Sequence, residues 1–134
     1  MSKYILYSDG ASRGNPGNAG AASILLDQSG RAVGDSKLFL GVQTNNVAEY
    51  KGLLIGLDLA IEKNVLILEC RMDSQLVVKQ MKGEYKVKHA ILIPLYLEAK
   101  EKIKKFMKVT FTYVPRKDNA RADALANLAI DQVV

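Results

Sequence analysis

The sequence is poor in the residues that cross-link small proteins or bind soft metals. It has one cysteine, one histidine and no tryptophan among 134 residues. A single cysteine, Cys70, excludes an intrachain disulfide, and one cysteine with one histidine excludes a structural zinc site built from four such ligands. Cys70 lies in an apolar stretch, which favours a buried packing role over a redox role.

Long hydrophobic runs and an N-terminal leader are also missing. No apolar stretch approaches the roughly 20 residues that a membrane-spanning helix needs. The most apolar candidate, residues 65–68, is followed directly by Glu69. No basic-then-apolar leader precedes residues 3–7. We therefore expect a cytoplasmic protein with no membrane partner.

What remains is the composition of an ordinary globular domain. Hydrophobic residues make up 49% of the chain and charged residues 25%, and the mean hydropathy is close to zero. A chain of 134 residues is long enough to bury about two-thirds of its unfolded surface and too short for two domains. We expect a single domain over residues 1–134.

Positive charge is concentrated in the second half of the chain. Residues 1–70 hold six lysines and arginines against seven acids, whereas residues 71–134 hold thirteen against seven. Clustered positive charge on a small domain is typical of polyanion-binding proteins, because bound phosphates release condensed counterions. A solvated basic helix would give the same count, so the charge alone leaves both interpretations open.

Hydrophobic periodicity predicts five strands and four helices. The strands are expected at residues 3–8, 20–26, 31–40, 65–72 and 109–114. The helices are expected from residue 46 to 60 or 61, and at 74–81, 90–106 and 120–130, with a polar loop at 115–119. Three hairpin-connected strands, then strands reached through helical crossovers, predict an α/β fold. Its five-stranded mixed sheet has three antiparallel and then two parallel strands, with helices on both faces.

Four acids fall where such sheets form their sites, beyond the carboxyl ends of parallel strands. Two are expected to end strands and two to lie in first turns of helices: Asp9, Asp73, Glu49 and Asp123. Most of them have an ordinary structural alternative. Glu49 fits a capping box with residues 46–49, and Asp73 and Asp123 fit helix starts, where acids complement the helix dipole.

Asp9 lacks such an alternative. Asp-Gly is typical of a hairpin turn, but residues 11–18 offer no strand that follows immediately. An unpaired carboxylate at the edge of a core is costly unless a cation or hydrogen-bond donors meet it. Four carboxylates without a cysteine and histidine cluster favour Mg²⁺ or Mn²⁺ over zinc.

The segments around these acids resemble the successive motifs of type 1 ribonuclease H (ribonuclease HI). They read YSDGAS at 7–12, GNPG at 14–17, TNNVAE at 44–49, MDSQ at 72–75 and NARADALA at 119–126. The similarity extends over nearly the whole chain. Each motif is weak alone, but all of them in order on the expected elements form a specific pattern.

The resemblance implies a catalytic cluster of Asp9, Glu49, Asp73 and Asp123 that holds two Mg²⁺ ions, with Mn²⁺ as an alternative. Such ions lie about 3.5–4 Å apart in two-metal sites. Asp9 would bridge both ions, and Asp123 would complete the ion that activates water. Glu49 and Asp73 would hold the ion at the leaving 3′-oxygen. The implied reaction hydrolyses the RNA strand of an RNA–DNA hybrid and leaves 5′-phosphate and 3′-hydroxyl ends.

The resemblance also implies contacts with the minor groove of the hybrid, where small residues let the backbone approach the 2′-hydroxyls. The expected substrate-binding residues are Gly10, Ser12, Asn15, Thr44, Asn45, Gln75 and Arg116. For Arg13, a phosphate contact and simple solvent exposure both stay open. We expect a monomer that binds an RNA–DNA hybrid and no organic cofactor.

The chain departs from many relatives in two places. The loop at residues 114–119 has no histidine, and Arg116 is the expected phosphate contact there. Residues 82–89 contain no inserted basic handle, so the lysines of that segment and of residues 100–108 must hold the substrate in a salt-sensitive way. The sole histidine, His89, is expected at the surface.

These departures leave two other functions open. One is an enzyme of the same fold that also acts on double-stranded RNA, because neither the missing handle nor Arg116 excludes that substrate. A module that binds the hybrid without cutting it is the other, although the complete set of four acids argues against it.

Overall fold

The computed structural model describes residues 2–134. The strands are β1 (Lys3–Arg13), β2 (Gly17–Leu26), β3 (Ala32–Gln43), β4 (Ile67–Met72) and β5 (Lys108–Tyr113). The helices are α1 (Asn45–Glu62), α2 (Gln75–Met81), α3 (Leu92–Ile103) and α4 (Ala120–Asp131), and a 3₁₀ turn, η1 (Arg116–Asn119), precedes α4. The expected α/β architecture is confirmed.

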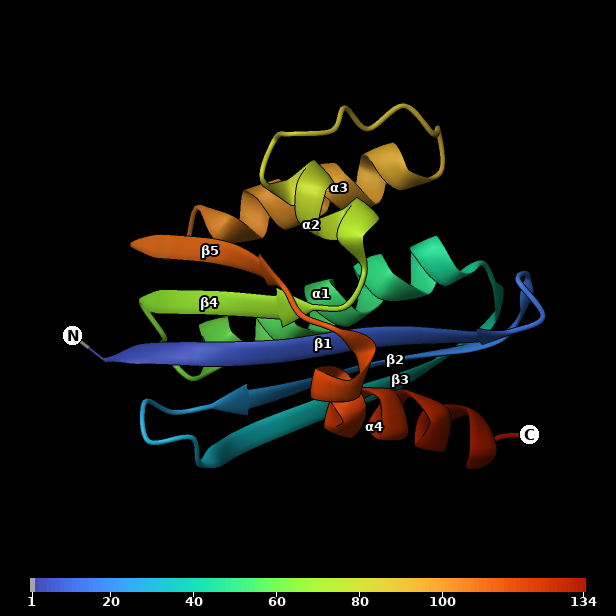
Figure 1. Cartoon of the computed structure of the whole chain (residues 1–134), viewed down its shortest axis with the longest axis horizontal. Helices are drawn as coiled ribbons and strands as arrows, with labels where there is room; N and C mark the ends of the chain where they lie inside the picture. Colours follow the sequence, from blue (N-terminus) through green and yellow to red (C-terminus); the bar gives the residue numbers. More distant parts are fainter. Residues whose placement is uncertain (1) are drawn as a thin grey trace.

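The five strands form one mixed sheet in the order β3-β2-β1-β4-β5. β1, β2 and β3 pair antiparallel, whereas β4 pairs parallel to both β1 and β5. β4 and β5 point the same way, and β4, which lies between β5 and β1, ends near the middle of β1 (Figure 1). The central strand β1 therefore separates the antiparallel part of the sheet from the parallel part.

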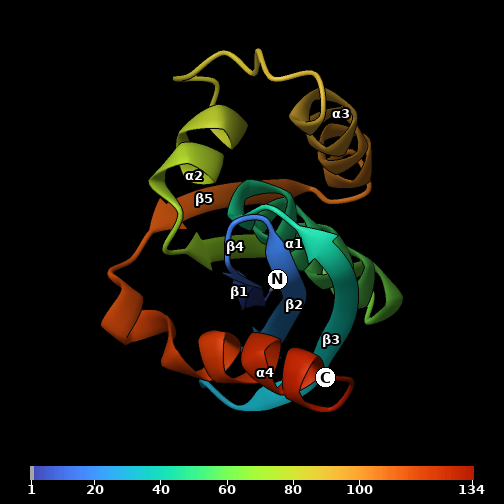
Figure 2. The same ribbon diagram turned by 90° about the vertical axis from the view of Figure 1, so that its right-hand side faces the viewer.

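Helices cover both faces of the sheet. α1 lies on one face against β1 and β2, and α4 lies on the opposite face against β2 (Figures 1 and 2). α3 packs on α1, and α2 contacts β5. The main core fills the space between the sheet and α1, and fully buried Leu6, Leu25, Leu53, Leu57 and Leu68 form its centre. Cys70 is fully buried and His89 is exposed, as expected.

β1 is longer than the sequence predicts, and this corrects the expected position of Asp9. Asp9 lies inside the strand and pairs with Ala22 of β2, and the antiparallel pairing continues to Arg13 and Asn18. Pairing with β4 ends at Tyr7. The hydrophobic pattern stops where the parallel partner stops, because beyond that point the strand forms one wall of a cleft.

Glycines let α1 approach β1 closely. A methyl group on Gly52 would lie 2.4 Å from the carbonyl oxygen of Asp9, and one on Gly10 would lie 2.2 Å from the carbonyl carbon of Ala48. On Gly56 a methyl group would lie 2.6 Å from the Leu6 side chain. At Gly10 and Gly52 the backbones of helix and strand are in direct contact, whereas at Gly56 the helix backbone packs on the Leu6 side chain.

Other boundaries also differ from the expected ones: β2 begins at Gly17 rather than at residue 20, and β3 ends at Gln43 rather than at residue 40. α3 ends at Ile103 rather than at residue 106, since residues 104–107 turn toward β5. The expected polar loop before α4 contains the short turn η1. Among residues 2–134, no helix has both the length and the hydrophobicity needed to cross a membrane.

The close contact between α1 and β1 makes a prediction about Gly52→Ala. Alanine at an ordinary helix position stabilises a protein by about 1 kcal/mol relative to glycine. Here the methyl group meets backbone, so we expect destabilisation by about 1–3 kcal/mol. Urea unfolding measures it, with Lys51→Ala on the same helix as the control. A stabilised Gly52→Ala protein would contradict the close approach.

Candidate active site

A cleft of about 540 Å³ lies where β4 and β5 end beside β1. All four predicted acids line it, together with residues of β1, α1 and α4. Asp9 comes from β1 and Asp73 directly follows β4, whereas Glu49 comes from α1 and Asp123 from α4. Because α1 and α4 cover opposite faces of the sheet, the acids converge from both sides of β1.

The position of Glu49 is set by α1 and by a backbone hydrogen bond. Thr44 is the N-cap of α1 and accepts a hydrogen bond from the Val47 amide at 3.3 Å. The capping-box alternative for Glu49 is therefore wrong, because the helix begins earlier than that pattern requires. Instead, Glu49 Oε1 accepts a hydrogen bond from the Gly10 amide at 2.8 Å. The same contact that needs glycine at position 10 thus aims this carboxylate at the cleft.

Three of the acids form a tight group. Asp9, Glu49 and Asp73 each place a carboxylate oxygen within 4.8 Å of the others. Asp9 and Glu49 are buried, with 3% and 7% of their surface exposed. In the described part of the chain, Asp123 is not a member of this group, although it lines the same cleft. It stands at the edge of the cluster, on α4.

Burial and mutual repulsion change the acidity of the cluster. Burial, reinforced by the carboxylates of Glu49 and Asp73, raises the pKa of Asp9 from 3.8 to about 11. Burial also raises the pKa of Glu49 from 4.5 to about 7, although the Gly10 hydrogen bond opposes the shift. Charged together, these groups repel one another, so the cluster retains protons unless a cation compensates their charge.

The residues present fit a divalent metal. Glu49 Oε2 is buried and has no hydrogen-bond partner within the described chain, which leaves it available as a ligand. A group of carboxylate oxygens with no histidine or cysteine among them is the donor set that Mg²⁺ and Mn²⁺ prefer. Asp9, Glu49 and Asp73 could hold such an ion, and Asp123 extends the set.

The structure separates the predicted substrate-binding residues into two groups. Gly10, Ser12, Asn45 and Arg116 line the cleft beside the acids. The Ser12 hydroxyl donates to the Gln43 carbonyl oxygen at 2.6 Å, which ties β1 to the end of β3.

The other predicted residues lie outside the lining of the cleft. Asn15 Oδ1 accepts a hydrogen bond from the Asn45 amide at 3.0 Å, and Thr44 caps α1. Gln75, at the start of α2, lines a neighbouring hollow. Tyr113 lines both this hollow and the main cleft. Asn15 and Thr44 therefore shape the backbone around Asn45.

Several residues that line the cleft were not predicted from the sequence or had no assigned role; Asn46 and Ser74 are two of them. Tyr113 and Asn127 were not singled out, and Arg13 was left open between phosphate and solvent. Arg13 in fact bonds to α4, through Asn127 and Asp131. Asn127 lies one helical turn after Asp123, and this spacing places two side chains on the same face of a helix. The spacing could have indicated from the sequence that Asn127 lies beside this acid.

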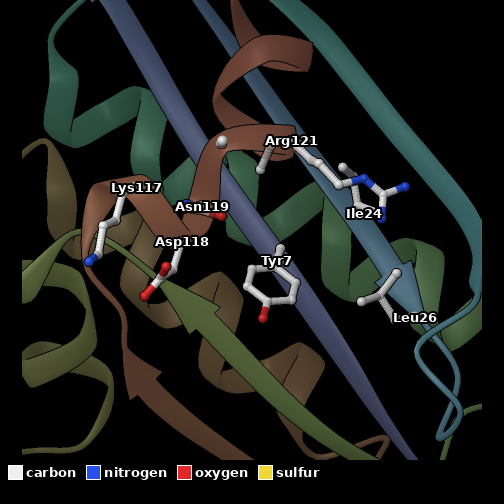
Figure 3. Close-up of a pocket in the computed structure, with 9 residues that line it drawn as sticks. Tyr7, Ile24, Leu26, Lys117, Asp118, Asn119 and Arg121 are labelled. Atoms are coloured by element: carbon white, nitrogen blue, oxygen red, sulfur yellow. The ribbon is translucent and has the colours of Figure 1, made fainter.

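A second hollow, of about 320 Å³, lies on the face of the sheet covered by α4. Tyr7 and Ile24 form its floor, and Asp118 and Arg121 lie around it (Figure 3). None of the four acids lines it. The carboxylate cluster therefore belongs to the main cleft alone.

Comparisons with known proteins agree with this geometry. A family model described as reverse transcriptase-like matches residues 7–129. The chain is 44% identical over 130 residues to a bifunctional protein of Mycobacterium tuberculosis, covering 96% of this chain and 36% of that protein. It is 42% identical over 125 residues to a ribonuclease HI of Halobacterium salinarum, covering 93% of this chain and 63% of that one. The chain thus spans only part of the length of these relatives.

Solved structures show the same fold. The N-terminal ribonuclease H domain of the mycobacterial protein superimposes with a TM-score of 0.95 at 42% identity, covering 98% of this chain and 96% of that one. A ribonuclease H1 named LC11, in complex with an RNA/DNA hybrid, gives a TM-score of 0.90 at 40% identity. That match covers 96% of this chain and 97% of the solved one.

The shifted acids predict how metal-free stability depends on pH. The folded state retains protons that the unfolded chain releases near pH 3.8 and 4.5. This stabilisation is complete below those values and is lost as pH rises through the folded-state pKa of Glu49, about 7. We expect the free energy of unfolding in EDTA to fall from pH 5 to pH 8. Each retained proton contributes a slope of about 1.4 kcal/mol per pH unit.

Urea unfolding at several pH values, in EDTA and in Mg²⁺, measures this dependence. Mg²⁺ is expected to stabilise the protein more at pH 8 than at pH 5, because deprotonated carboxylates bind it. Asp9→Asn removes one of the acids and is expected to flatten the metal-free profile. Metal-free stability that increases from pH 5 to pH 8 would contradict the assignment.

Proposed function

Because the chain belongs to the type 1 ribonuclease H family, we propose that it is an endonuclease that hydrolyses the RNA strand of RNA–DNA hybrids. The observation that carries this proposal is the group of Asp9, Glu49 and Asp73 oxygens within 4.8 Å of one another, with Asp123 in the same cleft. One similar structure, at 40% identity, is a complex with an RNA/DNA hybrid.

Two divalent ions are the proposed cofactor, with Mg²⁺ first and Mn²⁺ as an alternative. Bound at such a site, divalent ions activate a water molecule and stabilise the charge that develops on the phosphate and the leaving oxygen. Asp9, the least exposed of the acids, is the proposed shared ligand. Glu49 and Asp73 would hold an ion that stabilises charge on the leaving oxygen, and Asp123 would help to hold an ion that activates water. Cleavage is proposed to leave 5′-phosphate and 3′-hydroxyl ends.

The cleft wall suits a minor groove. Gly10, Ala11 and Ser12 follow Asp9 along β1 and line the cleft, so little side-chain bulk separates the backbone from a substrate. Hybrid recognition depends on groove width and on 2′-hydroxyls, which small residues and amides such as Asn45 can reach. These features support the hybrid as the substrate.

Cleavage of four matched duplexes tests the substrate class: RNA–DNA, RNA–RNA, DNA–DNA, and DNA containing a short RNA stretch. We expect cutting of the RNA strand in the first and last, in Mg²⁺ and in Mn²⁺, and none in EDTA. Equal cutting of RNA–RNA would show a double-stranded-RNA activity. Binding without cutting of any duplex would reduce the protein to a hybrid-binding module.

Asp9→Asn is the sharpest test of the acid cluster. Asparagine keeps the shape of the side chain but removes the charge proposed to hold both ions, so we expect cleavage to fall below detection. The folded state should persist, because the buried negative charge is removed rather than created. Steady-state cleavage of a hybrid in Mg²⁺ measures the effect, with circular dichroism as the folding control. Wild-type turnover by Asp9→Asn would refute the metal assignment.

Arg116 is the proposed contact with the scissile phosphate. It lines the cleft at the start of η1, the turn that leads into α4. Arg116→Ala is expected to lower kcat by roughly tenfold or more with a smaller change in KM, because the guanidinium acts on charge that develops in the transition state. The neighbouring Lys117, which does not line this cleft, provides Lys117→Ala as the matched control. An unchanged kcat in Arg116→Ala would exclude this role.

A further inference from the structure

The side chains of Arg13 and Asn127 connect the end of β1 to Asp123. Arg13 Nη2 donates to Asn127 Oδ1 at 3.1 Å, and Arg13 Nη1 pairs with Asp131 at 2.7 Å. Asn127 Nδ2 in turn donates to the Asp123 backbone carbonyl oxygen at 3.0 Å and reaches carboxylate Oδ1 at 3.4 Å. The chain of contacts therefore ends on one of the four acids.

Arg13 and Asp123 together determine which way the Asn127 amide points. A guanidinium can only donate hydrogen bonds, so Asn127 must turn its oxygen toward Arg13. The amide NH₂ group then faces Asp123, where it meets an acceptor. Without Arg13, the amide oxygen loses its donor, and only the two Asp123 acceptors still hold the NH₂ group in place.

Asp123 is the acid that most needs such support. The oxygens of Asp9, Glu49 and Asp73 form one compact group, and Asp123 is not a member of it. It is also only half-buried and lies on α4, whereas Asp9 and Glu49 are enclosed by the contact between β1 and α1. Neighbouring groups therefore have to hold its side chain in one orientation.

We propose that Arg13 and Asn127 are positioning residues that hold the Asp123 carboxylate in the orientation needed to bind a divalent ion. Arg13 fixes the Asn127 amide, and the amide fixes Asp123. Asp131 anchors Arg13 from the far end of α4. This inference rests on the proposed role of Asp123 as a metal ligand, and it assigns Arg13 to the site rather than to phosphate or solvent.

Metal affinity is the primary test, because it needs no substrate. Calorimetric titration of Mn²⁺ into the whole chain compares wild type with Asn127→Ala, and Asn127→Leu repeats the test with a side chain of similar size. We expect both variants to bind Mn²⁺ about tenfold more weakly, the usual effect of losing a group that orients a ligand. Thermal unfolding shows whether each variant is folded. Wild-type affinity in a folded Asn127→Ala or Asn127→Leu protein would overturn the proposal.

A double-mutant cycle tests whether Arg13 acts through Asn127. Arg13→Ala is expected to weaken Mn²⁺ binding by a smaller factor, and the double variant to be no weaker than Asn127→Ala alone. Arg31→Ala, an identical change in the turn between β2 and β3, controls for the lost charge. Fully additive effects, or the same weakening in Arg31→Ala, would exclude the relay.

Turnover provides a readout that a purely structural role would not give. In Asn127→Ala, kcat at low Mg²⁺ is expected to fall and to recover as Mg²⁺ is raised, with KM for the hybrid unchanged. A kcat loss that excess Mg²⁺ does not restore would argue against positioning. If the wild-type protein binds Mn²⁺ but cuts no hybrid, the proposed function fails, while the affinity comparison still decides the role of Asn127.

Discussion

The close contact between α1 and β1 is the constraint on which the acid cluster depends. Glycine at positions 10 and 52 removes the side chains that would hold helix and strand apart. At that separation the Gly10 amide reaches Glu49 Oε1 at 2.8 Å, and the carboxylate is brought next to Asp9. A wider spacing would leave Glu49 in the same helix but would remove its oxygen from the group. Packing between backbones thus sets the geometry of the charges.

The same packing works against the acids it assembles. Water cannot separate buried carboxylates that lie within 4.8 Å of one another, and the raised pKa values of Asp9 and Glu49 express that conflict. In the absence of metal, a protein with alanine-sized residues in place of these two buried acids would be more stable than this one. Residues that violate local stability rules in this way typically mark a functional site. Here the proposed divalent ions would compensate the charge of the acids.

Much of the fold could be predicted from the sequence, because strands and helices with strong periodicity define the mixed sheet. The four acids could be found because they belong to motifs. Local patterns failed where a distant partner decides the structure. Asp9 was expected to end its strand, but pairing with β2 carries β1 on to Arg13. Glu49 matched a capping box, yet its partner is Gly10, 39 positions away. The bond from Arg13 to Asn127 joins residues 114 positions apart, beyond the reach of any local pattern.

The extension of β1 beyond its parallel partner explains how acids from two faces of the sheet meet. Up to Tyr7 the strand is paired on both sides, and beyond Tyr7 only β2 continues beside it. The edge that β4 leaves free becomes the cleft. Along this segment, which is paired on one side only, Asp9 supplies a carboxylate. Gly10 contacts α1, and Arg13 is hydrogen-bonded to α4. Both helices are therefore aligned against the same few residues of one strand. A shift of that segment would move Glu49 and Asp123 together, which keeps the acids in register with Asp9.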